Sequence, residues 1–405
     1  MPHYSYLLIG GGMTADAATQ GIREVDPTGT IGLIGSEPVS LYNRPPLSKG
    51  LWKGDSLESI RRATAERGVV MHLGRTAREL DPAGKCVTDN TGVVYTYDKL
   101  LLATGGTPRR LPFGGDEIIY YRTVADYERL RALTAWGQRF AVIGGGFIGA
   151  EIAAALAMNG KEVVLIFPRK GIGDRIFPSE HGRFLNDLYG EHNVTVAAQE
   201  RAVGMERRGR RHALTLRHVR TGEVREILVA GVIAGLGITP NVALAQQAGL
   251  IEDNGMAMNG VEVDASLRTS DPAIYAAGDV ANFANPALGV RLRVEHEDNA
   301  NTMGRLAGRS MAGSAESYDH LPFFSSDLFD LRYEAVGQVD ALLEVVADWR
   351  ERHREGVLYY LRDGRVRGVL LWNIRGQIDA ARRLIAEPGP FRPEDLRGRL
   401  PEKPP

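Results

Sequence analysis

The sequence predicts an α/β protein, because one strand–glycine turn–helix pattern occurs twice along its 405 residues. In the first copy, a short apolar strand that starts at Leu7 leads into a glycine turn and a helix over 17–25. The second copy starts at Phe140 and continues into a helix over 152–158. From about Leu321 the pattern changes to strands followed by a helix, which predicts a further α+β domain.

The first glycine turn has the spacing of a dinucleotide site. Gly10, Gly12 and Ala15 fit G-x-G-x-x-A, and Thr14 lies between the last two. The first glycine permits a tight turn, the second lets the backbone approach a pyrophosphate, and the small third residue lets helix and strand pack closely. Glu37 follows the next strand, where a carboxylate binds the hydroxyls of an adenosine ribose. Together these features predict a bound dinucleotide.

The second copy differs from the first after its second strand. Gly144, Gly146 and Gly149 fit G-x-G-x-x-G, but Arg169 follows the strand 162–167, with Arg175 close behind. An acid at this point rejects a 2′-phosphate, whereas arginines accept one. The local pattern therefore favours NADPH. The alternative is that these cations are simply solvated and that selectivity is loose.

Composition and charge narrow the class of protein. A net charge of −1 gives no reason to expect nucleic-acid binding. No apolar run approaches the roughly 20 residues of a membrane span. The first strand begins within a few residues of Met1, so we expect no targeting peptide and a cytoplasmic protein. Cys86 is the one cysteine, which excludes an internal disulfide.

Two segments outside the glycine turns have ligand-binding character. Arg44 and Lys49 flank two prolines that hold the backbone extended, and the interpretation as cofactor contacts is favoured over two solvated cations. An apolar strand ends with the small residues Ala103-Thr104-Gly105, which let the backbone approach a ligand closely. Asp279 follows another small apolar strand, where it can cap a helix or accept hydrogen bonds from a polyol.

The C-terminal region is predicted to form a hairpin and a helix. Two strands over 358–373 surround Asp363-Gly364, a turn signal, and an amphipathic helix follows over 377–386. The stretch from Gly337 to Tyr359 looks helical. The proline-rich end predicts a poorly ordered tail.

Several motifs together resemble a known family. They are Arg44-Pro-Pro-Leu-Ser-Lys49, Ala103-Thr-Gly-Gly-Thr-Pro-Arg109, Gly144-Gly-Gly-Phe-Ile-Gly-Ala-Glu151, Ala277-Gly-Asp279, Val294-Glu-His296, Tyr333-Glu-Ala-Val-Gly337 and Leu371-Trp-Asn373. The chain resembles the FAD-dependent pyridine-nucleotide oxidoreductases, most of all apoptosis-inducing factor and its bacterial relatives, with the ferredoxin reductases next. The resemblance covers nearly the whole chain before the tail.

The resemblance implies two nested Rossmann-like dinucleotide-binding domains of the glutathione reductase type, plus a C-terminal α+β interface domain. The expected boundaries are an FAD-binding domain of residues 1–112 and 248–320, an NAD(P)H-binding domain of residues 113–247, an interface domain of residues 321–390 and a tail of residues 391–405. FAD is the implied resident cofactor, and NADH or NADPH is the implied co-substrate.

The resemblance also implies roles for individual residues. Lys49 would lie near the flavin N5 and pair with Glu151, and these two are the expected catalytic residues. The expected FAD-binding residues are Gly10, Gly12, Thr14, Ala15, Glu37, Arg44, Lys49, Ala77, Ala103, Thr104, Gly105, Arg122, Gly278, Asp279, Glu295, His296 and Ser325. The expected NAD(P)H-binding residues are Gly144, Gly145, Gly146, Phe147, Ile148, Gly149, Glu151, Arg169, Arg175, Gly237, Glu295, Glu334 and Asn373. No metal site is predicted.

Three departures from the family pattern affect the expected function. Ser325 stands where relatives place an aromatic near the flavin, which opens the pocket or lets Phe323 or Phe324 substitute. Arg169 replaces the acid that relatives use on the NAD ribose. The insertion of animal apoptosis-inducing factors is missing after Gly337, so an animal-type role in cell death is unsupported.

The first hypothesis is an oxidoreductase that passes electrons from NAD(P)H through FAD to a small iron–sulfur protein such as a ferredoxin or rubredoxin, a quinone or oxygen. The alternative is a flavoprotein redox sensor or assembly factor, similar to apoptosis-inducing factor, that dimerises on slow reduction. A thiol-dependent reductase is disfavoured, because the segment from Arg44 to Lys49 contains no cysteine. Either a monomer or a homodimer is compatible with the sequence.

Overall fold

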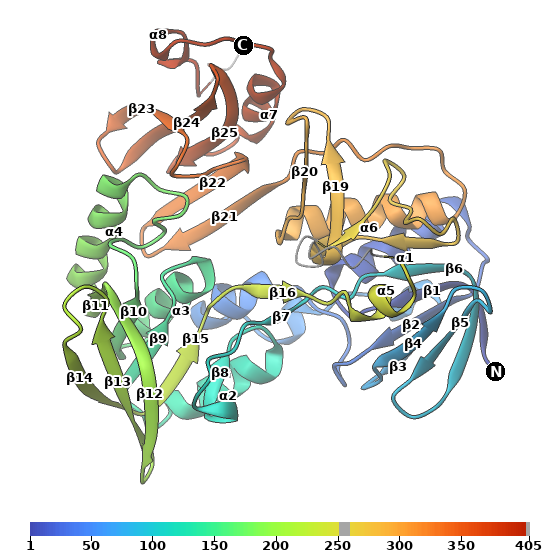
Figure 1. The fold of residues 1–405 in the computed structure, drawn as a ribbon, viewed down its shortest axis with the longest axis horizontal. Coiled ribbons are helices and arrows are strands. Elements are labelled where there is room, and N and C mark those ends of the chain that lie inside the picture. Colours follow the sequence, from blue (N-terminus) through green and yellow to red (C-terminus); the bar gives the residue numbers. More distant parts are fainter. Residues whose placement is uncertain (251–259, 402–405) are drawn as a thin grey trace. The chain divides into compact units, whose positions relative to one another are not determined.

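The computed structural model describes residues 1–250 and 260–401. They divide into two compact units (Figure 1). The first unit comprises Met1–Arg44, Leu57–Thr107 and Thr239–Phe323. The second comprises Pro45–Ser56, Pro108–Ile238 and the chain from Phe324 onward.

The first unit is built on a sheet whose central strands are parallel. Its strand order is β3-β2-β1-β6-β5-β4, and β18 also pairs with β6. The central strand carries Leu7 and Leu8, which are fully buried, as expected of a parallel strand covered on both faces. The bounds are β1 His3–Ile9, β2 Ile31–Gly35, β3 Val69–Leu73, β4 Ala77–Asp81, β5 Cys86–Asp89, β6 Val94–Leu102 and β18 Ile274–Ala276.

Two long helices of this unit, α1 (Met13–Val25) and α6 (Glu297–Met311), pack closely together (Figure 1). Glycine makes the approach possible, because a Cβ at Gly308 would lie 2.1 Å from the Ala18 carbonyl oxygen. The remaining elements of the unit are short. They are η3 Glu58–Ile60, η4 Ala65–Arg67, α5 Ala243–Gln247, β17 Val261–Glu262, η7 Gly278–Val280, β19 Ala281–Asn285 and β20 Val290–Leu292.

The second unit contains a parallel sheet of order β11-β10-β9-β15-β8 and a three-stranded sheet of order β12-β13-β14. The predicted strand at Phe140 is β9, and it is buried from Phe140 to Ile143. The bounds are η5 Gly115–Glu117, β8 Ile118–Tyr120, α2 Val124–Thr134, β9 Arg139–Ile143, α3 Phe147–Met158, β10 Glu162–Phe167, α4 Ser179–Glu191, β11 Val194–Ala198, β12 Glu200–Arg208, β13 Arg211–His218, β14 Val224–Val229 and β15 Gly231–Ala234.

Two short strands and two 3-10 helices lie outside these sheets. The strands β7 (Gly106–Pro108) and β16 (Ile238–Pro240) pair with each other. The 3-10 helices η1 (Pro45–Ser48) and η2 (Gly50–Lys53) belong to the second unit, where the side chain of Asn159 donates to the Trp52 carbonyl oxygen at 3.1 Å. The segment 45–56 therefore belongs to the same unit as the second glycine turn.

The C-terminal region forms an antiparallel sheet of order β21-β22-β25-β24-β23. The predicted hairpin around Asp363-Gly364 is present, and both turn residues have positive φ, as this tight turn requires. The prediction of a helix after Gly337 is wrong, because β23 occupies that stretch. The bounds are β21 Phe323–Leu328, β22 Leu331–Gly337, β23 Glu344–Glu351, β24 Glu355–Arg362, β25 Arg365–Trp372, α7 Ile378–Ala386 and α8 Pro393–Leu396.

The end of the described chain packs onto this sheet. Residues 391–401 were expected to belong to a flexible tail, but Leu396 and Leu400 are buried. The Leu400 N–H donates to the Tyr359 hydroxyl at 3.1 Å. Apolar side chains within the proline-rich stretch therefore dock this part of it. The remainder of the predicted tail, 402–405, lies outside the described residues.

A buried histidine joins α4 to the C-terminal sheet within the second unit. The ring of His181 stacks on Trp349 with centroids 5.4 Å apart and meets Trp372 edge-on at 4.2 Å. Burial lowers the pKa of His181 to about 3, and the neighbouring His353 acts in the same direction. The neutral ring is therefore the form that this packing accommodates.

This histidine should make the protein less stable in mild acid. The unfolded chain takes up a proton near the ordinary histidine pKa of 6.5, whereas the folded chain does so only near 3, so stability falls as the pH drops between these values. At about pH 5 the loss from His181 is about 2 kcal/mol. His181→Phe keeps an aromatic ring, and urea unfolding should show a smaller loss on acidification than in wild type. The same change at the exposed His3 serves as control, and an unaltered pH dependence in His181→Phe would contradict the assignment.

Candidate active site

The first glycine turn links β1 to α1 in the first unit. Gly10 has a φ of +132°, and a Cβ there would lie 2.1 Å from the Ala103 carbonyl oxygen, so only glycine fits. Gly12 faces open space, and it precedes the first N–H groups of α1 without any side-chain cap. Thr14 and Ala15 lie in the first helical turn. An exposed backbone at a helix N-terminus is the geometry that accepts a pyrophosphate.

The predicted ribose carboxylate, Glu37, follows β2 and already has partners. Its carboxylate accepts a hydrogen bond from the Tyr42 hydroxyl at 2.5 Å and is paired with Arg44. Burial alone would lower the pKa of Arg44, but Tyr42 and Glu37 raise it above the ordinary value. Arg44 therefore orients Glu37, and a ribose diol would share this carboxylate with the guanidinium.

The other predicted FAD-binding residues of the first unit lie on strand ends and turns. The Thr104 hydroxyl donates to the Asn241 carbonyl oxygen at 2.8 Å, which fixes the end of β6. Glu295 forms an ion pair with Arg293 at 2.7 Å. Burial lowers the pKa of His296 to about 4, while Asp298 acts in the opposite direction. The remaining members are Ala77 at the start of β4, Ala103 and Gly105 after β6, and Gly278 and Asp279 in η7.

The second glycine turn, between β9 and α3, repeats the geometry of the first. Gly144 has a φ of +120°, and a Cβ there would lie 2.3 Å from the Gly235 carbonyl oxygen. A Cβ on Gly149 would lie 1.8 Å from the Gly144 carbonyl oxygen, so helix and turn approach more closely than any other residue permits. Gly146 faces open space, as Gly12 does in the first turn. The residues present fit a second dinucleotide.

Two phenylalanines of the second unit contact each other at the start of α3. Phe147, at the start of α3, remains 39% exposed, and its ring meets Phe324 edge-on with centroids 4.8 Å apart. Phe324 precedes Ser325, the residue expected to replace the aromatic of the relatives. Phe324 therefore contacts the helix that follows the second glycine turn.

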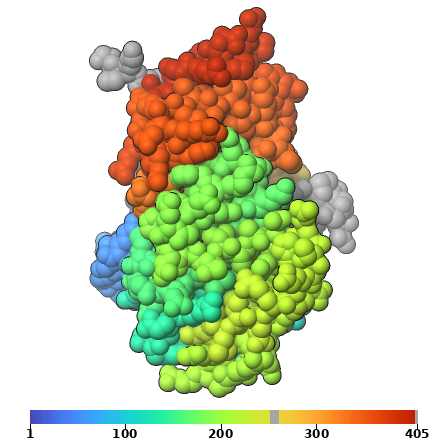
Figure 2. Space-filling model, turned by 90° about the vertical axis from the view of Figure 1, so that its left-hand side faces the viewer, coloured from blue at the N-terminus to red at the C-terminus, as the bar shows by residue number. Residues whose placement is uncertain are grey.

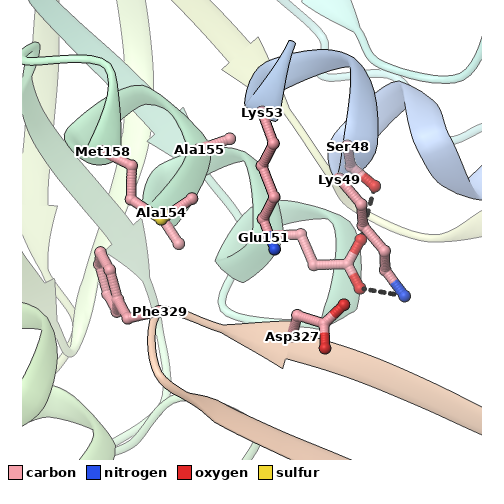
Figure 3. Close-up of a pocket in the computed structure, with 9 residues that line it drawn as sticks. All are labelled: Ser48, Lys49, Lys53, Glu151, Ala154, Ala155, Met158, Asp327 and Phe329. Carbon is pink, nitrogen blue, oxygen red and sulfur yellow. Dashed lines mark hydrogen bonds and ion pairs between the residues drawn. The ribbon is translucent and has the colours of Figure 1, made fainter. Parts of the chain in front are cut away.

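Glu151, on α3, is a buried carboxylate at the centre of a polar cluster (Figure 3). It accepts hydrogen bonds from the hydroxyls of Ser48 at 2.5 Å and Ser326 at 2.6 Å, and its Oε1 lies 3.5 Å from the Lys49 Nζ. Lys49 also donates to the Ser325 carbonyl oxygen at 2.9 Å. The predicted ion pair between Lys49 and Glu151 is therefore formed, and the ammonium is held in one position.

Burial and hydrogen bonding have opposite effects on the carboxyl group of Glu151. Burial raises the pKa of Glu151, while Lys49 and the two serine hydroxyls act in the opposite direction. A small pocket opens beside the carboxylate, and Lys53 points into it (Figure 3). Its lining consists of Ser48, Lys49, Lys53, Glu151, Ala154, Ala155, Met158, Asp327 and Phe329.

Sequence reasoning missed the two serines that bind Glu151. Ser48 lies inside the motif that ends at Lys49. The pattern of residues in this motif does not indicate which group the Ser48 hydroxyl contacts. Ser326 lies next to Ser325 on β21, and the alternation of a strand points it to the opposite face. The alternation signal was available, but the partner lies 175 positions away in the sequence.

Of the remaining predicted coenzyme residues, one group lies on loops and the other lies in the C-terminal region. Arg169 and Arg175 are exposed beyond the end of β10, and Gly237 lies in a turn with a φ of +80°. Glu334 is buried on β22, and its Oε2 has no hydrogen-bond partner among the residues the structure describes. Asn373 has a structural role in addition to its predicted one. Its side chain accepts from the Arg332 N–H at 2.7 Å and donates to the Arg354 carbonyl oxygen at 2.9 Å, so the amide fixes two backbone segments, and its contact with the coenzyme stays a prediction.

Three residues assigned to FAD by resemblance belong to the second unit. Lys49 and Ser325 lie in the Glu151 cluster, and Arg122 lies just before the N-terminus of α2, where its N–H donates to Asp126 at 3.1 Å. Gly145 and Ile148 were predicted to bind NAD(P)H. They lie at the second glycine turn, beside the other residues of that turn that were predicted to bind it.

Comparison with known proteins agrees with this geometry. The family model "Pyridine nucleotide-disulphide oxidoreductase" matches residues 4–304, and the model "Apoptosis-inducing factor, mitochondrion-associated, C-term" matches residues 348–387. The chain therefore belongs to the pyridine nucleotide-disulphide oxidoreductase family. It is a ferredoxin reductase-like enzyme that uses FAD and NAD(P)H, and with one cysteine it has no redox-active disulfide.

Individual relatives cover nearly the whole chain. The ferredoxin reductase subunit of 5,5'-dehydrodivanillate O-demethylase from Sphingobium sp. is 35% identical, over 90% of this chain and 89% of its own. Apoptosis-inducing factor 1 of Dictyostelium discoideum is 32% identical, over 94% of this chain and 78% of its own. The crystal structure of the covalent putidaredoxin reductase–putidaredoxin complex superposes with a TM-score of 0.87 at 27% identity, over 97% of this chain and 95% of that one.

Within residues 1–250 and 260–401, every helix is too short or too polar to cross a membrane.

Proposed function

We propose that the protein oxidises NAD(P)H through FAD and delivers the electrons to a small ferredoxin-type iron–sulfur protein. One observation carries this proposal. The chain holds two dinucleotide turns but a single cysteine, so electrons that enter from a nicotinamide have no internal disulfide to reduce and must leave to an external acceptor. The names of the relatives, which include ferredoxin reductase components, support an iron–sulfur acceptor.

The residues of the second unit would bind and orient the coenzyme. Gly146 leaves room for the pyrophosphate at the N-terminus of α3, and Phe147 with Phe324 forms an aromatic wall beside it. The buried Glu334 Oε2 is available to accept a hydrogen bond from a coenzyme amide. Bound FAD would supply the hydride acceptor and release electrons singly. Because hydride transfer depends chiefly on alignment, these contacts are the protein's main contribution.

Lys49 would act as a fixed positive charge. Its ammonium is bound by the Ser325 carbonyl oxygen and the Glu151 carboxylate, which removes rotational freedom before any ligand arrives. A preorganised charge stabilises developing negative charge at little cost in reorganisation. Placement of this ammonium beside the flavin follows from the family resemblance and is part of the proposal.

Anaerobic reduction assays test the acceptor. With NAD(P)H in excess, the enzyme should reduce an added bacterial [2Fe–2S] ferredoxin, and the rate should fall steeply as salt rises, because docking of a protein partner through charges is screened. Reduction of a small neutral quinone, run in parallel, should lack this salt dependence. Fast quinone turnover with no ferredoxin reduction at any ionic strength would refute the proposed acceptor. No observation specifically favours the redox-sensor alternative.

A further inference from the structure

The segment 168–178, called here the coenzyme loop, joins β10 to α4 beside the second glycine turn. It carries three exposed cations: Arg169, Lys170 and Arg175. None of the three side chains forms an ion pair with any residue in the ranges 1–250 and 260–401. The loop also carries the carboxylate of Asp174, so its three cations leave a net positive charge that attracts a multiply charged anion.

The backbone of the coenzyme loop is fixed although its cations are exposed. The Gly173 N–H donates to the Gly145 carbonyl oxygen at 2.8 Å, which ties the loop to the glycine turn. The Lys170 N–H donates to Asp174 Oδ2 at 2.9 Å, and the Asn186 side chain donates to the Lys170 carbonyl oxygen at 2.8 Å. The bases of the cationic side chains are therefore held in defined positions.

The C-terminal sheet and the connection between β22 and β23 supply a second set of hydrogen bonds and contacts, all within the second unit. The Tyr360 hydroxyl donates to the Ile176 carbonyl oxygen at 2.7 Å, and the Ala341 N–H donates to the Arg175 carbonyl oxygen at 2.9 Å. Phe177 is buried edge-on against Tyr333 and Trp372, with centroids 5.3 and 5.5 Å apart. Figure 2 shows the green surface of this part of the chain meeting the orange surface of the C-terminal sheet.

We propose that the C-terminal sheet sets coenzyme preference by holding the coenzyme loop where its cations bind the 2′-phosphate of NADPH. Tyr360 and Ala341 are then positioning residues, because they touch the loop backbone and not the ligand. This inference rests on the proposed oxidation of NAD(P)H. It assigns to the C-terminal domain a role in coenzyme recognition in addition to any contact with an electron acceptor.

The physical reason is the steep distance dependence of charge-assisted hydrogen bonds. Guanidinium and phosphate must meet at hydrogen-bond distance, so a small displacement of the loop backbone weakens the contact. NADH lacks the 2′-phosphate and leaves the cations unused. Loosening the loop should therefore lower the affinity for NADPH and leave the affinity for NADH unchanged.

Tyr360→Phe is the direct test, because it removes the hydroxyl and keeps the buried ring. Calorimetric titration of the FAD-loaded protein with NADP⁺ and NAD⁺ measures binding without turnover. The affinity for NADP⁺ should fall about fivefold, as expected for one lost hydrogen bond, with that for NAD⁺ unchanged. Tyr359→Phe is the matched control, since the Tyr359 hydroxyl contacts Leu400 and not the loop; it should alter neither affinity.

Hydrogen exchange across 168–178 makes the outcome decisive. Faster exchange in Tyr360→Phe together with a selective loss of NADP⁺ affinity supports the proposal. Faster exchange with unchanged NADP⁺ affinity, unchanged exchange and affinity, or an equal loss of both coenzymes overturns it. Failure of the wild-type protein to bind either coenzyme would instead refute the proposed function. An Arg169→Ala variant with wild-type NADP⁺ affinity would show that the loop does not bind the phosphate.

Discussion

Replacing Arg169 by glutamate is expected to reduce the affinity for NADPH by about 100-fold, with a small gain for NADH. The substitution removes a cation from the end of β10 and places an acid where the hydroxyls of an NAD ribose would be bound. It also repels a 2′-phosphate, so the two effects act in the same direction. The measurement is the rate and affinity of flavin reduction by each coenzyme in anaerobic stopped flow.

A matched variant separates local recognition from a change in overall charge. Arg220→Glu makes the same change on an exposed turn of the second unit, where the side chain has no ion-pair partner within the described ranges. It should leave the ratio of the two coenzymes at the wild-type value. If wild type already prefers NADH strongly, or if Arg169→Glu leaves the ratio unchanged, then the basic segment after β10 does not select the coenzyme.

Replacing Glu151 by alanine is expected to destabilise the protein by about 3 kcal/mol and to slow flavin reduction. Lys49 would lose the carboxylate 3.5 Å away, and the hydroxyls of Ser48 and Ser326 would lose the carboxylate oxygens to which they donate. Among the residues that the structure describes, the ammonium would then be held by the Ser325 carbonyl oxygen alone. Urea unfolding measures the stability, and stopped-flow reduction measures the rate.

Two further variants serve as controls for the effects of Glu151→Ala. Glu151→Gln keeps the volume and one carbonyl acceptor but removes the charge, so its stability should lie between those of wild type and Glu151→Ala. Glu128→Ala, on the exposed face of α2, should be close to neutral. Wild-type stability and reduction rate in Glu151→Ala would show that the buried cluster is dispensable.

Local chemistry made the two dinucleotide turns predictable. Gly10 and Gly144 have φ values of +132° and +120°, which few residues other than glycine adopt, and each follows a strand buried on both faces. The tight turn at Asp363-Gly364 was predictable for the same reason. Where a residue type is required by its own backbone conformation, the sequence is sufficient evidence of the structure.

Long-range contacts were not predictable in this way. Asn373 and the serines that bind Glu151 carry polar groups with many possible partners, and only the folded chain selects among them. The packing of Leu396 and Leu400 likewise depends on an apolar surface that distant strands create. The family resemblance supplied one such pair, Lys49 with Glu151, but the other ties came from the structure alone.

The sequence by itself determined the fold class, the two dinucleotide turns and the absence of an internal dithiol, because each depends on residues close together or on a count. Only the tertiary structure showed that Arg44 forms an ion pair with Glu37, that Ser48 and Ser326 donate hydrogen bonds to Glu151, and that the C-terminal sheet holds the coenzyme loop. These features join segments separated by many residues, and their geometry depends on how the strands are paired and how the side chains fill the space between them.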